Sequence, residues 1–283
     1  MKIPTKKLKN GFEMPIYGIG TWKMGENSSE FEKETDVIKK AIELGVTHID
    51  TAEVYADGKA EKVIGYAIKK YDRKKLFLVS KVFGNHLEYE SLLKSVKQSL
   101  ERLNTDYLDL YLLHRFNPQV PLQETMSAMD WLYEQKIIRN IGISNYTVKQ
   151  TIMARKASKY LVVANQLHLN LKNRETEKKG LLEYCQKEDM MFIAWRPLKD
   201  VELNIPIISG MTKKYKKTPS QIAINWLISQ QNVVTLSKTS NIEHLRENLG
   251  SLDFEMEKED IEKLRNYYPN QRFISDTVPL LEN

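Results

Sequence analysis

The sequence is poor in cysteine and has no long apolar run, and both shortages exclude classes of protein. Cys185 is the single cysteine among 283 residues, which excludes an intramolecular disulfide and fits a reducing compartment. The longest apolar runs stay far below the roughly 20 residues of a membrane helix. The basic start, MKIPTKKLKNG, has no apolar core behind it, which argues against a secretory signal. We therefore expect a cytoplasmic protein with no membrane partner.

The excess of positive over negative charge is also small. The net charge is +6, but lysine and arginine are scattered and interleaved with acidic residues. The two dense basic runs, residues 69–75 and 213–217, lie at or beside predicted helix ends. Solvated helix ends explain such runs better than a nucleic-acid surface, so no nucleic-acid partner is expected.

Short apolar segments alternate along the chain with amphipathic helical patterns. The segments that read as strands are largely apolar through their middles, as in parallel sheets buried on both faces. They are Ile16–Gly20, Val46–Asp50, Leu76–Lys81, Tyr107–His114, Ile138–Ser144, Leu161–Gln166, Met190–Trp195 and Val233–Ser237. Eight strands, each followed by a helix, predict an α/β fold of the (β/α)₈ TIM-barrel type.

Additional elements are expected at both ends of the barrel sequence. Thr5–Leu8 and Phe12–Met14 flank Asn10-Gly11, a strong turn signal, and predict an N-terminal β-hairpin. Lys258–Tyr267 predicts one more helix, followed by an irregular tail. No linker or repeat interrupts residues 1–283, so one domain is expected.

Three successive predicted strands end on polar side chains. Asp50 ends the second strand, Lys81 the third and His114 the fourth, and Tyr55 follows in the loop after Asp50. The carboxyl ends of barrel strands meet at one rim, where catalytic groups of such barrels lie. Each residue alone would be an ordinary strand end that meets solvent. Together they predict a catalytic site.

The chemistry of these four side chains suits proton delivery to a carbonyl oxygen. An ammonium beside a phenol favours the phenolate and lowers its pKa from about 10, and Asp50 would hold Lys81 charged. His114 would orient the carbonyl by a hydrogen bond. The set contains no electron source, nucleophile or metal cluster, so no metal is expected. An external hydride donor, a nicotinamide cofactor, is implied.

Motifs spread over nearly the whole chain resemble those of the aldo-keto reductases. They are D-T-A-x-x-Y at 50–55, SKV at 80–82, LLH at 112–114, GISN at 142–145, NQ at 165–166, and SK followed by EN at 237–248. The resemblance implies NAD(P)H-dependent reduction of aldehydes and ketones. Asp50, Tyr55, Lys81 and His114 match the catalytic residues of the family, with Tyr55 as the general acid.

The resemblance also implies the cofactor site. Ser144, Asn145 and Gln166 match the residues that bind the nicotinamide carboxamide, and Trp195 stands where a tyrosine usually stacks on the ring. Lys238 precedes the Thr239–Asn241 helix start, which the family uses for the adenosine 2′-phosphate of NADP. The full implied set is Thr21, Asp50, Ser144, Asn145, Gln166, Trp195, Arg196, Pro197, Leu198, Lys238, Thr239, Ser240, His244, Glu247 and Asn248.

Two departures from the family pattern concern the cofactor. His244 stands where many members have an arginine that grips the 2′-phosphate in a bidentate fashion. NADP (NADPH) is therefore the expected cofactor, with NAD as an alternative. Arg196 stands where a serine is frequent; it either reaches the cofactor pyrophosphate or caps the sheet rim.

A third departure concerns the substrate pocket. Trp22 and Phe83, in the loops after the first and third strands, are expected to line it. Arg115 replaces the tryptophan common after the strand-four histidine. It either turns outward into a surface ion pair, the more usual outcome for an arginine, or attracts anionic carbonyl substrates. Short loops at 115–121 and 197–206 predict an open pocket for small aldehydes and α-keto or dicarbonyl compounds.

Other readings of the sequence stay open. A barrel of this fold can serve as a nicotinamide-binding sensor with little turnover, although the intact four residues favour an enzyme. A Schiff-base aldolase would need a neutral lysine, which Asp50 opposes. His48, within the second strand, is expected to face the helices. The chain is expected to be a monomer or a weak homo-oligomer.

Overall fold

Eight parallel strands form a closed barrel in the computed structural model, which describes residues 2–281. Hydrogen-bonded neighbours follow the order β10-β3-β4-β5-β6-β7-β8-β9. The strands are β3 (Tyr17–Gly20), β4 (His48–Asp50), β5 (Phe77–Val82), β6 (Leu110–Leu113), β7 (Ile141–Ser144), β8 (Val162–His168), β9 (Met191–Trp195) and β10 (Val233–Ser237). All eight predicted strands are confirmed, with the β10 bounds as predicted.

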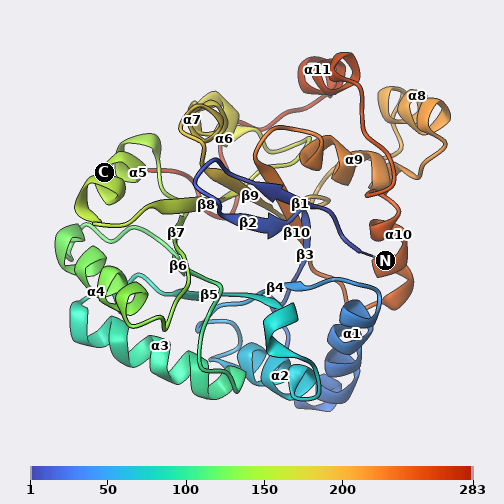
Figure 1. Cartoon of the computed structure of the whole chain (residues 1–283). Coiled ribbons are helices and arrows are strands. Elements are labelled where there is room, and N and C mark those ends of the chain that lie inside the picture. Colours follow the sequence, from blue (N-terminus) through green and yellow to red (C-terminus); the bar gives the residue numbers. More distant parts are fainter. Residues whose placement is uncertain (1, 282–283) are drawn as a thin grey trace.

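Helices surround the barrel because their apolar stripes pack on the outer face of the strands (Figure 1). They are α1 (Phe31–Glu43), α2 (Lys59–Ile68), α3 (Tyr89–Leu103), α4 (Leu122–Glu134), α5 (Val148–Ala157), α6 (Glu175–Lys178), α7 (Leu181–Lys187), α8 (Pro206–Tyr215), α9 (Pro219–Ile228), α10 (Ile242–Leu249) and α11 (Lys258–Tyr267). Short 3₁₀ turns lie at Ser28–Glu30 and Arg73–Lys75. The predicted C-terminal helix is confirmed as α11.

An N-terminal hairpin covers the amino end of the barrel. Strands β1 (Thr5–Lys7) and β2 (Glu13–Pro15) pair antiparallel and lie across this end in Figure 1. The Asn10 side chain accepts a hydrogen bond from the Phe12 amide at 2.9 Å, and Gly11 takes the left-handed φ of 92° that the turn requires. The Phe12 ring meets that of Phe77 at 6.2 Å. The hairpin thereby closes the end opposite to the site.

His48 lies inside the barrel, and the expectation that it faces the helices is wrong. Residues two apart in a strand share a face, and Asp50 points inward, bonded to Lys81 and Gln166. His48 is paired with Gly18, where an added Cβ would lie 2.3 Å from the imidazole Nδ1. Burial lowers the pKa of His48 to about 4.

Candidate active site

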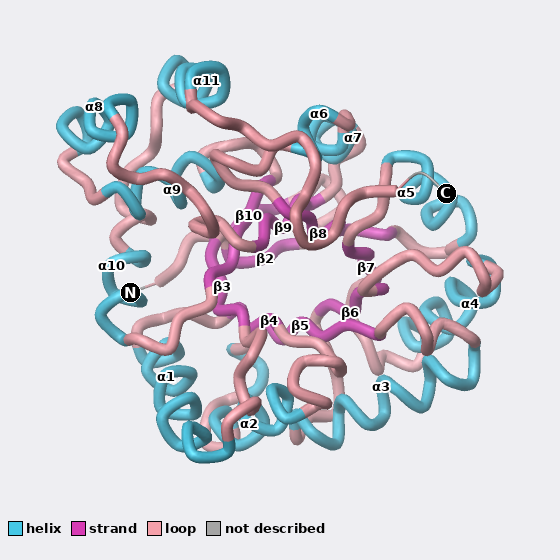
Figure 2. The backbone as a smooth tube through the Cα atoms, turned by 180° about the vertical axis from the view of Figure 1, so that it is seen from behind, coloured by secondary structure: helices cyan, strands magenta, loops and turns pink. Residues whose placement is uncertain are grey.

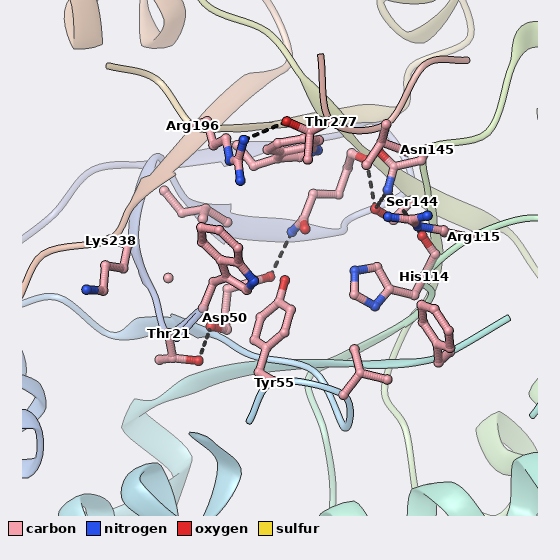
Figure 3. Close-up of a pocket in the computed structure, with 18 residues that line it drawn as sticks. Thr21, Asp50, Tyr55, His114, Arg115, Ser144, Asn145, Arg196, Lys238 and Thr277 are labelled. Atoms are coloured by element: carbon pink, nitrogen blue, oxygen red, sulfur yellow. Dashed lines mark hydrogen bonds between the residues drawn. The ribbon is translucent and has the colours of Figure 1, made fainter. Parts of the chain in front are cut away.

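A cavity of about 310 Å³ opens at the carboxyl end of the barrel, the end that faces the viewer in Figure 2. Side chains at the ends of most barrel strands and in the C-terminal tail line it (Figure 3). The lining residues are Gly20, Thr21, Trp22, Asp50, Val54, Tyr55, Phe83, His114, Arg115, Ser144, Asn145, Gln166, Trp195, Arg196, Leu236, Lys238, Thr277 and Val278.

A buried ion pair lies directly beneath this cavity. The Lys81 ammonium donates hydrogen bonds to Asp50 Oδ1 at 2.6 Å and to the Thr51 carbonyl at 2.7 Å. Its Nζ is also 3.5 Å from the Tyr55 hydroxyl oxygen. Gln166 Nε2 donates to the second oxygen of Asp50 at 2.7 Å. Every oxygen of the carboxylate therefore has a donor, as a buried charge requires.

The pKa values of this group follow from burial and from the pair. Burial acts to lower the pKa of Lys81, but Asp50 and Tyr55 outweigh it and the pKa is raised, so the amine is charged. Burial raises the pKa of the Tyr55 phenol, and Lys81 only partly opposes it. The expectation of a net lowered phenol pKa is therefore wrong for this structure, although the ammonium acts in the expected direction. The phenol holds its proton at neutral pH.

His114 follows β6, two strands along the barrel from β4, which carries Asp50. Its imidazole meets the Tyr55 ring edge-on at 5.8 Å and the Phe83 ring at 5.9 Å. Burial, followed by the charges of Lys81 and Arg115, lowers the pKa of His114 well below its usual range. The ring is thus a neutral imidazole, which has one N–H to donate and one acceptor nitrogen.

Three amide and hydroxyl side chains gather at the ends of β7 and β8. Asn145 Nδ2 donates to Ser144 Oγ at 3.0 Å and to the His114 carbonyl at 3.2 Å, and Ser144 Oγ donates to the Gln166 carbonyl at 2.9 Å. Asn145 has a left-handed φ of 60°, which asparagine tolerates better than most residues. These side chains are the carboxamide-binding set expected from the sequence, and the fold brings them together.

Aromatic and cationic side chains form the remaining side of the cavity. Trp195 stacks on His168 with ring centroids 4.3 Å apart. The Arg196 guanidinium lies 4.8 Å from the Trp22 ring and 5.4 Å from the Trp195 ring, and donates to Thr277 Oγ1 at 2.7 Å. Arg196 therefore links three segments at the mouth of the cavity.

Several residues of the expected cofactor set lie outside the cavity lining. They are Pro197, Leu198, Thr239, Ser240, His244, Glu247 and Asn248. Glu247 accepts a hydrogen bond from Thr218 Oγ1 at 2.7 Å, and Asn248 donates to Ser237 Oγ at 3.2 Å. His244 is exposed in the first turn of α10, whose N-cap is Asn241. Pro197 and Leu198 follow β9, whereas the other five lie between β10 and the end of α10.

The C-terminal tail contributes two lining residues that the sequence did not reveal, Thr277 and Val278. Buried Glu175 holds this segment by accepting the amides of Ser275 at 2.8 Å and Leu280 at 3.0 Å. Ser275 Oγ also lies 2.9 Å from His168 Nδ1. No periodic pattern marks such a tail, so only its position in the fold shows that it forms part of the site.

The described residues hold neither a metal cluster nor a membrane-spanning helix. Within residues 2–281, no three His, Cys, Asp or Glu side chains gather to hold a metal ion. None of the helices described has the length and apolarity needed to span a membrane. The basic runs are partly paired, for example Arg73 with Asp109 and Lys214 with Asp260.

The chain matches known reductases over most of its length. The aldo/keto reductase family model matches residues 17–204 and 201–269. Methylglyoxal reductase YeaE of Escherichia coli is 36% identical over 90% of this chain and 92% of that protein. Glyoxal reductase of Bacillus subtilis is 35% identical over 92% of this chain and 91% of its own.

Solved structures agree in fold as well as in sequence. A thermostable aldo-keto reductase in complex with the inhibitor epalrestat superposes with a TM-score of 0.89, at 40% identity, covering 93% of this chain and 99% of that one. An aldo/keto reductase of Klebsiella pneumoniae in complex with NADP and acetate gives 0.85 at 32% identity, covering 99% and 100%. This chain belongs to the aldo/keto reductase family.

Proposed function

We propose that this protein reduces aldehydes and ketones to alcohols with NADPH, and that Tyr55 is the general acid. One observation carries the proposal: the Tyr55 hydroxyl lies 3.5 Å from the buried Lys81 ammonium, which is itself 2.6 Å from Asp50. Both Tyr55 and Asp50 line the cavity at the carboxyl end of the barrel. A protonated phenol next to a fixed positive charge can release its proton as negative charge develops on the substrate oxygen.

The donor set of the cavity fits a nicotinamide cofactor. Asn145 and Gln166 offer carboxamides at one side, Trp195 offers an aromatic face, and Lys238 and Arg196 offer positive charge. When bound, NADPH supplies the hydride for the carbonyl carbon. The Klebsiella relative is in complex with NADP, which supports this choice of cofactor. Use of NAD as well is part of the proposal, because His244 replaces the expected arginine.

The residues around Tyr55 have the other roles in the proposed reaction. Neutral His114 donates a hydrogen bond that orients the carbonyl oxygen toward Tyr55. Trp22 and Phe83 exclude water from the apolar side of the cavity. Lys81 does not line the cavity and is held charged by Asp50, which disfavours a Schiff base. The names of two relatives, reductases of methylglyoxal and of glyoxal, support small dicarbonyl substrates.

The test is turnover of a carbonyl panel with NADPH and NADH, followed by loss of nicotinamide absorbance. We expect many turnovers per protein with methylglyoxal, glyoxal or benzaldehydes, and a fall in kcat of about 10²–10⁴-fold in Tyr55→Phe, with NADPH binding retained. Tyr66→Phe, on the exposed side of α2, is the matched control and should keep its rate. Tight NADPH binding without turnover would instead identify a nicotinamide sensor.

A further inference from the structure

Arg115 is a cation of the active-site cavity that has no acidic partner. It lines the cavity and is an exposed residue. Among residues 2–281 it forms no ion pair, and its guanidinium carbon lies 6.0 Å from the centre of the Phe83 ring. The expectation of an outward surface ion pair is therefore wrong for the described part of the chain.

The position of Arg115 is set by the strand that delivers His114. β6 ends at Leu113, His114 follows, and Arg115 is the next residue, on the same wall of the cavity (Figure 3). The Phe83 ring is near both side chains, 5.9 Å from the His114 ring and 6.0 Å from the Arg115 guanidinium carbon. The positive charge also reaches the imidazole, because Arg115 contributes to the lowered pKa of His114.

The other cations near the cavity have partners or other tasks. Lys81 is neutralised by Asp50 at 2.6 Å. Arg196 donates to Thr277 and lies between two tryptophan rings. Lys238, after β10, is part of the proposed cofactor site. Among residues 2–281, Asp50 is the sole acidic residue that lines the cavity. The wall beside His114 thus carries a positive charge that no side chain of the described residues balances.

We propose that Arg115 is an anion subsite beside the reduction site, and that the preferred substrates are aldehydes or ketones that also carry a carboxylate. The inference rests on the proposed reductase function. Arginine suits this task because its planar guanidinium binds a carboxylate through two parallel hydrogen bonds. The carboxylate is not changed in the reaction: hydride adds to the carbonyl carbon, the Tyr55 proton adds to the oxygen, and a hydroxy acid leaves.

The test compares two aldehydes that differ in one charge, 4-carboxybenzaldehyde and its neutral methyl ester, methyl 4-formylbenzoate. With NADPH at saturation, kcat/KM of the wild type should be higher for the acid. In Arg115→Met the ratio of acid to ester should fall by about tenfold or more, mainly through KM of the acid. Arg115→Lys should recover part of the ratio, because an ammonium keeps the charge but lacks the planar fork.

Two controls separate this subsite from general electrostatics and from the reaction itself. Arg139→Met removes the same charge at the amino end of the barrel, just before β7. Arg139 is half exposed there and stacks on Tyr107. This variant should leave the ratio of acid to ester unchanged. If the ratio of acid to ester is equal in the wild type and in Arg115→Met, the anion subsite is wrong. Reduction of the ester in the same experiment would still support the reductase function. Failure of the wild type to reduce either aldehyde overturns the proposed function itself.

Discussion

The imidazole of His168 lies flat against the indole of Trp195, with ring centroids 4.3 Å apart and planes only 15° apart. The two residues end the neighbouring strands β8 and β9 and are paired in register. His168 is also held by Ser275 of the tail, 2.9 Å from its Nδ1. One face of Trp195 is therefore covered by protein, which fixes the plane of the ring that is proposed to meet the nicotinamide.

We expect His168→Ala to weaken NADPH binding because Trp195 would lose its support. Aromatic pairs contribute about 0.5–1.5 kcal/mol, which corresponds to a rise in Kd of roughly 2- to 10-fold. Quenching of tryptophan fluorescence during an NADPH titration measures this. His168→Phe keeps a flat ring and should bind NADPH nearly as tightly as the wild type. An equal loss of NADPH affinity in both variants would show that stacking on Trp195 does not determine this affinity.

Lys81→Met should change the pH dependence of the reaction. In alcohol oxidation the phenolate of Tyr55 is the proposed base, so the rate should rise as pH passes the phenol pKa. Lys81 lowers that pKa against the larger effect of burial, so its loss should move the rise to higher pH. The measurement is kcat against pH with NADP and an alcohol.

A stability control accompanies this variant, because Lys81→Met leaves the buried Asp50 unpaired and costs about 3–5 kcal/mol. Adding Asp50→Asn removes the unpaired charge and should restore much of the stability. An unmoved pH profile in a folded Lys81→Met protein would argue against electrostatic control of Tyr55.

His244→Arg should increase the preference for NADPH over NADH. The side chain is exposed in the first turn of α10, six residues after Lys238, where helix N–H groups already favour an anion. A charge-assisted hydrogen bond is worth about 1.5–3 kcal/mol, so the ratio of the two Kd values should change by about tenfold or more. His86→Arg, which adds the same charge in the β5–α3 loop, controls for net charge. A similar change of the ratio in both variants would show that the 2′-phosphate does not bind beside residue 244.

His48 should make the fold sensitive to acid. Its pKa is lowered to about 4 inside the barrel, against about 6.5 in an unfolded chain. Between these values the unfolded state binds the extra proton, so stability is complete above about pH 6.5 and falls as pH drops toward 4, by about 3 kcal/mol at most. Urea unfolding at about pH 7.5 and pH 5 measures this. His48→Gln cannot titrate, and an equally steep loss in that variant would assign the acid sensitivity to other groups.

The barrel and the four strand-end residues were predictable because both follow from local patterns. Apolar strands separated by amphipathic helices specify a (β/α)₈ barrel, and in that fold all strands point their carboxyl ends to one rim. Asp50 ends β4, Lys81 is the last residue but one of β5, and His114 follows β6, so the fold had to bring them together. The hairpin at Asn10-Gly11 was predictable for a similar reason, since the turn itself selects those residues.

Orientation and burial were decided only by the tertiary structure. His48 faces the interior because it lies two residues before Asp50 in the same strand, and Asp50 points inward to Lys81. The pKa of the Tyr55 phenol is raised because burial outweighs the effect of the nearby ammonium. The tail reaches the cavity because Glu175, a hundred residues away in the chain, holds Ser275. Arg115 lines the cavity although its side chain could equally have turned to solvent. The sequence thus determined which chemical groups meet at the rim. Packing decided the pKa of each group, through its burial, and the direction in which its side chain points.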